Sequence, residues 1–220
     1  MTLTATTLTP TEGDDIEIRA IEESSNDVFQ WNGPKTNLTN QSSVLRIDDI
    51  KLSQSGIYYC NKGNADCNSS IGDSIVINVQ LKQETPPCTP ANNTMTSSGV
   101  PGETFSYVNK SFDATFNAIT MYANGPYGYP PFTIVFNSYN GNVEPRDGTY
   151  TTTEGYSFNV LQEPNEISIS FIYASTFIHC LPGKKAYVSH VNGKLQVTFC
   201  DLEFASPLPH VRCSAKITQL

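Results

Sequence analysis

The chain has 220 residues, with 13 Lys or Arg against 21 Asp or Glu, and a formal net charge of −8. This acidic balance argues against binding to nucleic acid or to an anionic membrane surface, because phosphate groups require clustered cations. Charged residues make up only 15% of the sequence, and its 14 glycines and 14 prolines suit short strands and turns. Since no segment shows a sustained 3.6-residue apolar period, the sequence predicts an all-β protein, long enough for two domains.

Residues 1–81 are predicted to form the first domain. Ile16, Ile18 and Ala20 alternate with polar residues, which is the pattern of a strand with one buried face. Phe29 and Trp31 share the next such pattern. The remaining strands are predicted at 3–10, 45–50, 56–60 and 75–81. Roughly seven short strands in this length predict a sandwich of two sheets.

Trp31 and Cys60 indicate the type of sandwich. In immunoglobulin-like domains a strand Trp fills the core, and a Tyr two residues before a Cys forms the tyrosine corner, as Tyr58 does here before Cys60. Ala20, however, occupies the position of the partner cysteine of antibody domains. We therefore expect a core without an intersheet disulfide, stabilised by burial alone.

Four segments extend this comparison to a family. They are Gly13-Asp14-Asp15-Ile16, Trp31-Asn32-Gly33-Pro34, the run from Leu45 to Ile50, and Ser55-Gly56-Ile57-Tyr58. Together they resemble the Ig-like domains that occur in tandem in exported bacterial surface proteins and, less closely, animal I-set and V-set domains. Gln54 replaces the Asp of the animal pattern, which favours the bacterial version. The resemblance covers about residues 3–81 and implies a fold rather than a ligand.

Residues 82–102 are predicted to be an interdomain linker stiffened by Pro86-Pro87, with Cys88 pinned to the second domain. Residues 103–220 again predict strands, and Asn192-Gly193 predicts a type I′ hairpin turn. The predicted strands are 112–120, 132–136, 167–173, 185–191, 194–199 and 211–217. We expect a second β-sandwich or a barrel-like domain. Its order of strands resembles the uncharacterised β domains that close some bacterial exported lipoproteins.

Six cysteines without a CxxC pair predict structural disulfides and an oxidising compartment. A hairpin centred on Gly63-Asn64 would place Cys60 opposite Cys67, which predicts a bridge between them. For the second domain two pairings remain open. The first joins Cys200 to Cys213 across a hairpin and Cys88 to Cys180, and the second joins Cys88 to Cys213 and Cys180 to Cys200.

The sequence shows no catalytic or metal-binding constellation. It has no G-x-S-x-G motif, and its three histidines lack H-x-H or H-x-x-x-H spacing. The side chains considered were His179, His190, His210, Glu154, Glu163, Glu166 and the acidic turns Asp14-Asp15 and Asp48-Asp49. We interpret these as loop and surface residues, so we predict a protein that is not an enzyme and has no metal and no cofactor.

The stretch 121–132 is the best candidate for ligand contacts. Tyr122, Tyr127, Tyr129 and Phe132 lie among Gly and Pro, and aromatic rings on a stiff loop lose little entropy on binding. The alternative is that these rings pack against prolines and close the loop over the core.

These observations predict a non-enzymatic extracellular or cell-surface module for binding, adhesion or structural spacing. The alternative is a carbohydrate-binding surface lipoprotein that uses the aromatic loop. We expect a protein or glycan partner outside the cell, at the outer surface or in the periplasm, and no nucleic acid. No apolar run could span a bilayer. Met1 before Thr2-Leu3-Thr4 is expected to replace a removed export signal or lipid anchor.

Overall fold

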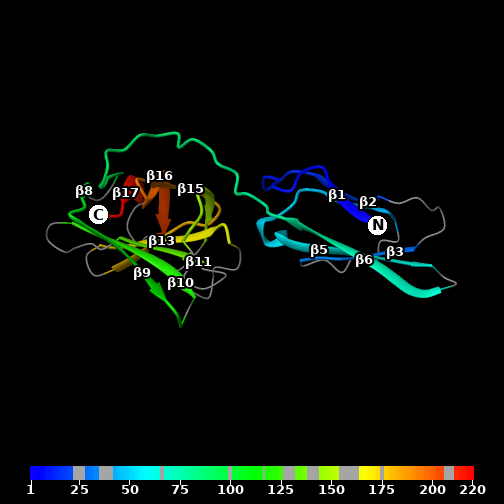
Figure 1. Cartoon of the computed structure of the whole chain (residues 1–220). Coiled ribbons are helices and arrows are strands. Elements are labelled where there is room, and N and C mark those ends of the chain that lie inside the picture. Colours follow the sequence, from blue (N-terminus) through cyan, green and yellow to red (C-terminus); the bar gives the residue numbers. More distant parts are fainter. Residues whose placement is uncertain are drawn as a thin grey trace. The chain divides into compact units, whose positions relative to one another are not determined.

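Two units built from β strands make up the chain, Met1–Lys82 and Gln83–Leu220 (Figure 1). The predicted all-β class is therefore confirmed. The structure is a computed structural model, and it describes residues 1–21, 28–34, 42–64, 67–98, 101–115, 117–125, 132–137, 144–153, 164–173, 176–205 and 211–220, with the backbone alone at 64, 67–71, 137, 173 and 176–177.

The first unit consists of two antiparallel sheets of three strands each. One has the order β1-β2-β4 and the other β3-β5-β6. The strands are β1 (Thr2–Ala5), β2 (Ile16–Ile21), β3 (Val28–Asn32), β4 (Val44–Ile47), β5 (Gly56–Asn64) and β6 (Cys67–Ile77), with a short 3-10 helix η1 (Leu52–Gln54) before β5. Alternate residues of both sheets are buried between them, as the period of two along a strand requires.

Trp31 and Tyr58 have the roles that the sequence predicts for them. Trp31 is buried, and its indole Nε1 donates a hydrogen bond to the carbonyl of Ser42 at 2.8 Å. The Tyr58 hydroxyl donates to the carbonyl of Gln54 at 2.8 Å, which is the tyrosine corner. Gly33 packs directly against this ring, since a Cβ atom at Gly33 would lie 2.5 Å from Tyr58 Cδ1. The immunoglobulin-like sandwich is thus confirmed for the first unit.

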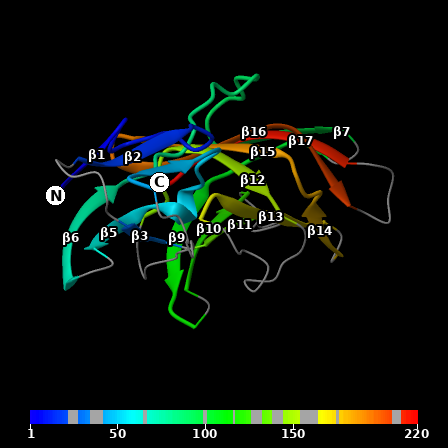
Figure 2. The same ribbon diagram turned by 90° about the vertical axis from the view of Figure 1, so that its right-hand side faces the viewer.

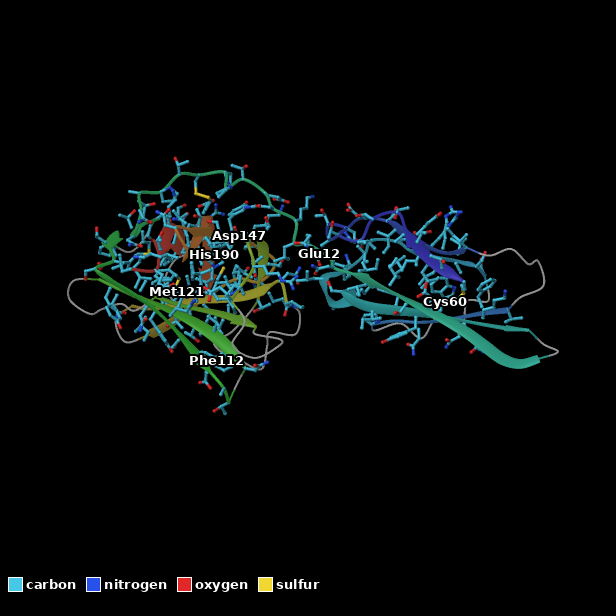
Figure 3. All side chains as sticks on the ribbon, in the orientation of Figure 1. Glu12, Cys60, Phe112, Met121, Asp147 and His190 are labelled. Atoms are coloured by element: carbon cyan, nitrogen blue, oxygen red, sulfur yellow. A yellow bond between two sulfur atoms is a disulfide. The ribbon has the colours of Figure 1, made fainter. Side chains whose placement is uncertain are left out.

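The register of β5 and β6 differs from the predicted one. Cys60 lies opposite Asp73, and Cys67 lies opposite Asn64. The predicted bridge between Cys60 and Cys67 needed these two residues to face each other, and the prediction was wrong because both strands extend beyond the expected turn. Cys60 is completely buried inside the unit (Figure 3), whereas the side chain of Cys67 lies outside the described residues.

The second unit is formed by one large curved sheet. Its order is β8-β7-β17-β16-β15-β12-β13-β11-β10-β9, with β14 beside β13 and β16. The strands are β7 (Thr94–Ser98), β8 (Glu103–Thr104), β9 (Tyr107–Asp113), β10 (Ala118–Asn124), β11 (Phe132–Asn137), β12 (Gly148–Thr152), β13 (Glu166–Tyr173), β14 (Thr176–Cys180), β15 (Lys185–Val191), β16 (Lys194–Ala205) and β17 (Val211–Thr218). The predicted second sandwich or barrel-like unit is therefore present.

The curvature of this sheet produces two layers. Strands β7, β17, β16 and β15 form one layer, and β13, β11, β10 and β9 form the other (Figure 2). The backbone N–H of Leu220 donates to the carbonyl of Val108 at 3.2 Å, so the end of the described chain reaches the edge strand β9. Asn192 and Gly193 both have positive φ, as the predicted type I′ turn between β15 and β16 requires.

An aromatic cluster fills the space between the two layers. The ring of Phe132 stacks on Phe171 at 5.3 Å between centroids and lies 5.6 Å from Phe199 and 6.2 Å from Phe204. All four side chains are at most 1% exposed. Such rings dominate the apolar area that a core removes from water, so this cluster is the main stabilising feature of the second unit.

Residues 83–93, which we call the strap, arch over the layer of β15, β16 and β17 (Figures 1 and 2). A disulfide joins Cys88 to Cys200, and β7, which follows the strap, pairs with β17. The segment 82–102, which the sequence predicts as a linker, therefore supplies a strand of the second unit.

Neither predicted pairing of the second-unit cysteines contains this disulfide. A bulge between Phe199 and Leu202 shifts the register of β16, so Leu202 rather than Cys200 lies opposite Cys213. Cys200 then lies half-exposed below the strap, within reach of Cys88. Cys180 and Cys213 are buried as free thiols.

Candidate functional site

The outer side of the sheet β3-β5-β6 is the most distinctive surface of the first unit. Its residues alternate with the buried Phe29, Trp31, Tyr58 and Cys60 and therefore point away from the core. We call it the uncharged face, and its described members are Val28, Gln30, Asn32, Ile57, Tyr59, Asn61, Gly72, Ser74 and Val76.

Apolar side chains are contiguous on the uncharged face. Ile57 and Val76 lie directly opposite each other and are 44% and 59% exposed. Tyr59, which is 47% exposed, follows on the same side of β5 and lies between Asn32 of β3 and Ser74 of β6. Scattered exposed apolar residues are ordinary, but neighbouring ones on one face form a patch that marks contact surfaces.

The outer side of the opposite sheet has a different chemistry. There Glu17 forms ion pairs with Arg19 and with Arg46, the latter at 2.9 Å between Oε1 and Nε. By contrast, none of the nine residues of the uncharged face is charged, although the segment 1–82 contains six Lys or Arg and eleven Asp or Glu. One side of the sandwich thus carries ion pairs, whereas the described residues of the other are polar or apolar but not charged.

This composition matches the centre of a protein–protein interface. Such centres have few charged residues and are enriched in tyrosine, because burying a charge without a partner is costly. The sequence prediction did not include Ile57, Tyr59 and Val76. The signal was present, since Ile57 and Tyr59 alternate with the inward Tyr58 and Cys60.

The residues predicted to contact a ligand in the second unit have different environments. Phe132 belongs to the aromatic core and is 0% exposed, so it offers no surface to a ligand and that prediction was wrong. Tyr122 is half-buried on the outer side of β10. Tyr127 and Tyr129 lie outside the described residues.

Tyr122 belongs to a row of polar side chains that crosses five strands. The register places Tyr122 between Asn109 and Thr133, and Thr133 is followed by Ser170 and His179. Thr133 and Ser170 are buried. Burial also lowers the pKa of His179, which favours a neutral imidazole. Of this row, Asn109 and Tyr122 are the side chains whose amide and hydroxyl groups a polar ligand could reach, whereas Thr133 and Ser170 are buried.

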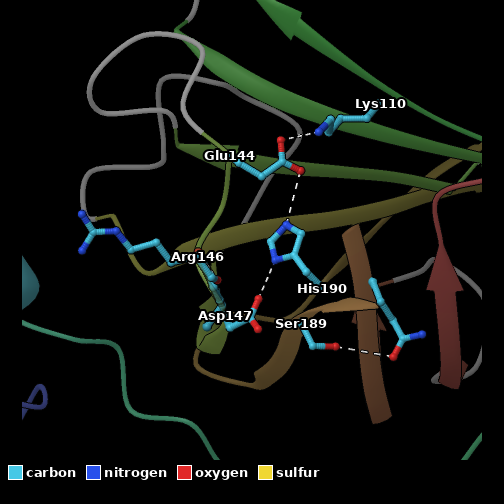
Figure 4. A network of polar contacts seen from close by, with 8 residues as sticks. Lys110, Glu144, Arg146, Asp147, Ser189 and His190 are labelled. Atoms are coloured by element: carbon cyan, nitrogen blue, oxygen red, sulfur yellow. Dashed lines mark hydrogen bonds and ion pairs between the residues drawn. The ribbon is translucent and has the colours of Figure 1, made fainter. Parts of the chain in front are cut away.

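His190 lies in a separate charged network at one end of the second unit (Figure 4). Its Nδ1 is 2.5 Å from Asp147 Oδ1, and its Nε2 is 3.4 Å from Glu144 Oε1. Glu144 also pairs with Lys110 of β9, so the network connects β9 with β15. The two carboxylates lie at opposite ring nitrogens and therefore fix the orientation of the imidazole ring.

The other acidic and histidine side chains considered from the sequence do not assemble into a site. Asp15 Oδ1 accepts a hydrogen bond from the Asp49 N–H at 2.9 Å, and Asp14 Oδ2 accepts one from the Thr11 N–H at 2.8 Å, so these carboxylates stabilise turns. Across the described ranges, no three His, Cys, Asp or Glu side chains are arranged around one point so that they could hold a metal ion, and the two carboxylates beside His190 lie at opposite ring nitrogens. His210, Glu154 and Glu163 lie outside those ranges.

The sequence matches no protein-family model and no curated protein. Among solved structures, the chain is similar to the three N-terminal domains of the highly immunogenic outer capsid protein of bacteriophage RB49, with 12% identity and a TM-score of 0.32 over 99% of this chain. The chain spans 58% of the length of that structure. It is also similar to murine CEACAM1b, with 11% identity and a TM-score of 0.31 over 100% of this chain and 99% of the other.

Within the part of the chain that the structure describes, no helix is long and apolar enough to cross a lipid bilayer.

Proposed function

We propose that this protein is a non-enzymatic binding or adhesion module that contacts another protein through the uncharged face of its first unit. The observation that supports this proposal is the contrast between the two outer sides of the sandwich. Glu17, Arg19 and Arg46 form ion pairs on one side, whereas Ile57, Tyr59 and Val76 are exposed on the other, where none of the described residues is charged.

Ile57, Val76 and Tyr59 could contribute a few kcal/mol to the free energy of binding a protein partner. Full burial of an Ile or Val side chain contributes about 1.5–3 kcal/mol. Ile57 and Val76 are about half exposed, so a partner would gain a part of this from each. Tyr59 adds an aromatic ring and a hydroxyl, the combination most often found among residues that dominate binding energy. The three side chains together could therefore form the centre of an interface.

The proposed location is outside the cell, at an outer surface or in the periplasm. The disulfide between Cys88 and Cys200 supports this location, because such bonds persist in oxidising compartments. We also propose that the first unit is an Ig-like domain of the type found in exported bacterial proteins, and that a lipid anchor outside this sequence attaches the protein to the cell.

A second candidate is carbohydrate binding by the second unit. The neighbouring Asn109 and Tyr122 favour it, because their amide and aromatic groups are of the kind that bind sugars and neither side chain is buried. Tyr127 and Tyr129 follow Tyr122 closely in the sequence and are proposed to extend this surface.

Parallel arrays distinguish the two candidates. Biotinylated full-length chain is applied to an array of purified extracellular proteins and to a glycan array. The protein-binding proposal predicts protein partners whose binding is lost in Tyr59→Lys and kept in Tyr122→Ala. Binding to glycans alone, lost in Tyr122→Ala and kept in Tyr59→Lys, would establish the second candidate instead.

A further inference from the structure

A pocket of about 240 Å³ lies between the strap and the outer side of β15, β16 and β17. By volume it could hold about eight water molecules. The sheet contributes Tyr187, Ser189, Gln196, Thr198 and Lys216 to its lining. These five side chains point to the side of the sheet opposite the aromatic core, because they alternate along their strands with buried residues.

The polar groups of the pocket are held in fixed positions. Gln196 Nε2 donates to Thr218 Oγ1 at 2.7 Å, and Thr218 Oγ1 donates to Asn92 Oδ1 at 2.5 Å. These bonds orient the Gln196 amide so that its Oε1 lies 3.5 Å from the Ser189 hydroxyl. Thr198 lies between Tyr187 and Lys216 in the register, so these three side chains start from neighbouring positions on the same side of the sheet. A ligand would meet donors and acceptors that are already positioned.

The charge within the pocket is positive. Glu84, the acidic residue in the lining, binds Lys185 Nζ through both carboxylate oxygens at 2.9 and 2.7 Å. Lys216 has no ion-pair partner among the residues that the structure describes. In a chain with a net charge of −8, an ammonium group without a carboxylate partner beside fixed hydroxyl and amide groups is suited to an anionic polar ligand.

We propose that this pocket binds a sugar acid, a small carbohydrate with one carboxylate group. The carboxylate would pair with Lys216, the hydroxyl groups would form hydrogen bonds with Ser189, Thr198 and Gln196, and the ring of Tyr187 would contact the apolar side of the sugar. A neutral sugar would leave Lys216 without a counter-charge, and a simple carboxylate would not use the further hydrogen bonds that Ser189, Thr198 and Gln196 can make.

The strap closes the pocket, and the disulfide fixes the strap. At one end the Glu84 N–H donates to Thr149 Oγ1 at 3.0 Å, and at the other end Asn93 Oδ1 accepts a hydrogen bond from the Thr218 N–H at 2.7 Å. Between these ends the strap is bonded covalently to the sheet through Cys88 and Cys200. Loss of this bond should therefore weaken binding, because the strap would have to be ordered by the ligand.

This proposal is independent of the proposed protein-binding face, because the pocket belongs to the second unit and the uncharged face to the first. A protein-array result that removes the protein-binding proposal therefore leaves this one unaffected.

The test is a nuclear magnetic resonance titration of the ¹⁵N-labelled full-length chain with its disulfide intact. The probes are D-glucuronate, D-galacturonate, D-glucose and acetate. The expected result is a saturable shift of the amide signals of β15, β16 and β17 with at least one of the two sugar acids, with affinity about tenfold higher than for glucose or acetate. Lys216→Gln should reduce this affinity by about tenfold, whereas Lys194→Gln, an exposed lysine at the turn between β15 and β16, should not change it.

The Cys88→Ser/Cys200→Ser variant should also bind more weakly, provided that its amide spectrum remains that of a folded protein. If this variant does not fold, Lys216→Gln still decides the question. The absence of shifts with both sugar acids, equal affinity for acetate, or unchanged binding in Lys216→Gln would each overturn the proposal.

Discussion

The Tyr58 hydroxyl donates a hydrogen bond of 2.8 Å to the carbonyl of Gln54, and the side chain of Tyr58 is completely buried. Tyr58→Phe should therefore lower the free energy of unfolding of the first unit by about 1 kcal/mol, since it leaves the carbonyl without this donor. The chain has one tryptophan, Trp31 in the first unit, so its fluorescence in a urea titration measures this change. An unchanged unfolding midpoint would show that the tyrosine corner does not stabilise the unit.

The same tyrosine predicts a dependence on alkaline pH. Burial raises the pKa of Tyr58 from 10.0 to about 12. The unfolded chain loses this proton near pH 10 while the folded chain retains it, so the stabilising contribution is present below pH 10 and is lost as the pH rises from 10 to 12. Over this interval the unfolding free energy of the wild type should fall by on the order of 2 kcal/mol relative to that of Tyr58→Phe, so the wild type is the more stable of the two near neutral pH and the less stable at the upper end of the interval. The measurement runs from about pH 9, one unit below the ordinary tyrosine pKa, to about pH 12, the raised pKa of Tyr58. A constant difference in unfolding free energy over this range would contradict the assignment.

Gly33 is predicted to tolerate no side chain. A Cβ atom there would lie 2.5 Å from Tyr58 Cδ1, so Gly33→Ala should destabilise the first unit by about 1–3 kcal/mol. Gly63 provides the matched control, because a Cβ atom at that position meets nothing within 4 Å. Gly63→Ala should change the stability by no more than about 0.5 kcal/mol. Equal effects of the two substitutions, measured by Trp31 fluorescence in urea, would contradict the packing.

Removal of the disulfide should affect the second unit alone. Cys88 and Cys200 are separated by 112 residues, and a bridge closing so long a segment restricts the unfolded chain strongly. Cys88→Ser/Cys200→Ser should reduce the unfolding free energy of the second unit by about 2–5 kcal/mol, measured by circular dichroism in guanidinium chloride. The transition reported by Trp31 should stay where it is. A shift of the Trp31 transition of the same size would mean that the bridge stabilises the first unit as well.

Local patterns were sufficient to predict the fold of the first unit. Trp31 and Tyr58 each define a specific core position, and alternation around Ile16 and Ile18 defines the buried side of a strand. In the same way Asn192-Gly193 predicted its turn, because the required positive φ is a property of those two residues.

Long-range pairings could not be predicted in this way. The bond between Cys88 and Cys200 depends on the bulge after Phe199, which decides whether Cys200 points into the core or out of it. Phe132 was assigned to a binding loop because Pro and Gly precede it, but it is the first residue of β11, which lies inside the sheet between β13 and β10, and it points into the core.

Describing the uncharged face required both the local pattern of the sequence and the long-range pairing of the strands. Alternation along β5 was visible in the sequence and places Ile57 and Tyr59 on the outer side. Their proximity to Val76 depends on the register of β5 with β6, which the sequence did not predict correctly. The absence of charge on the whole face is a property of three strands together and becomes visible only when their order is known.

The central claim is that the uncharged face binds a protein, and the most direct measurement is the dissociation constant for a partner found on the protein array. Surface plasmon resonance would compare the wild type with Tyr59→Lys and with Thr4→Lys, which places the same charge at an exposed position on β1 of the opposite sheet. The proposed function predicts that Tyr59→Lys weakens binding by at least about tenfold, since an interface centre would bury the new charge without a partner, and that Thr4→Lys has no effect. Equal dissociation constants for the wild type and Tyr59→Lys would contradict it.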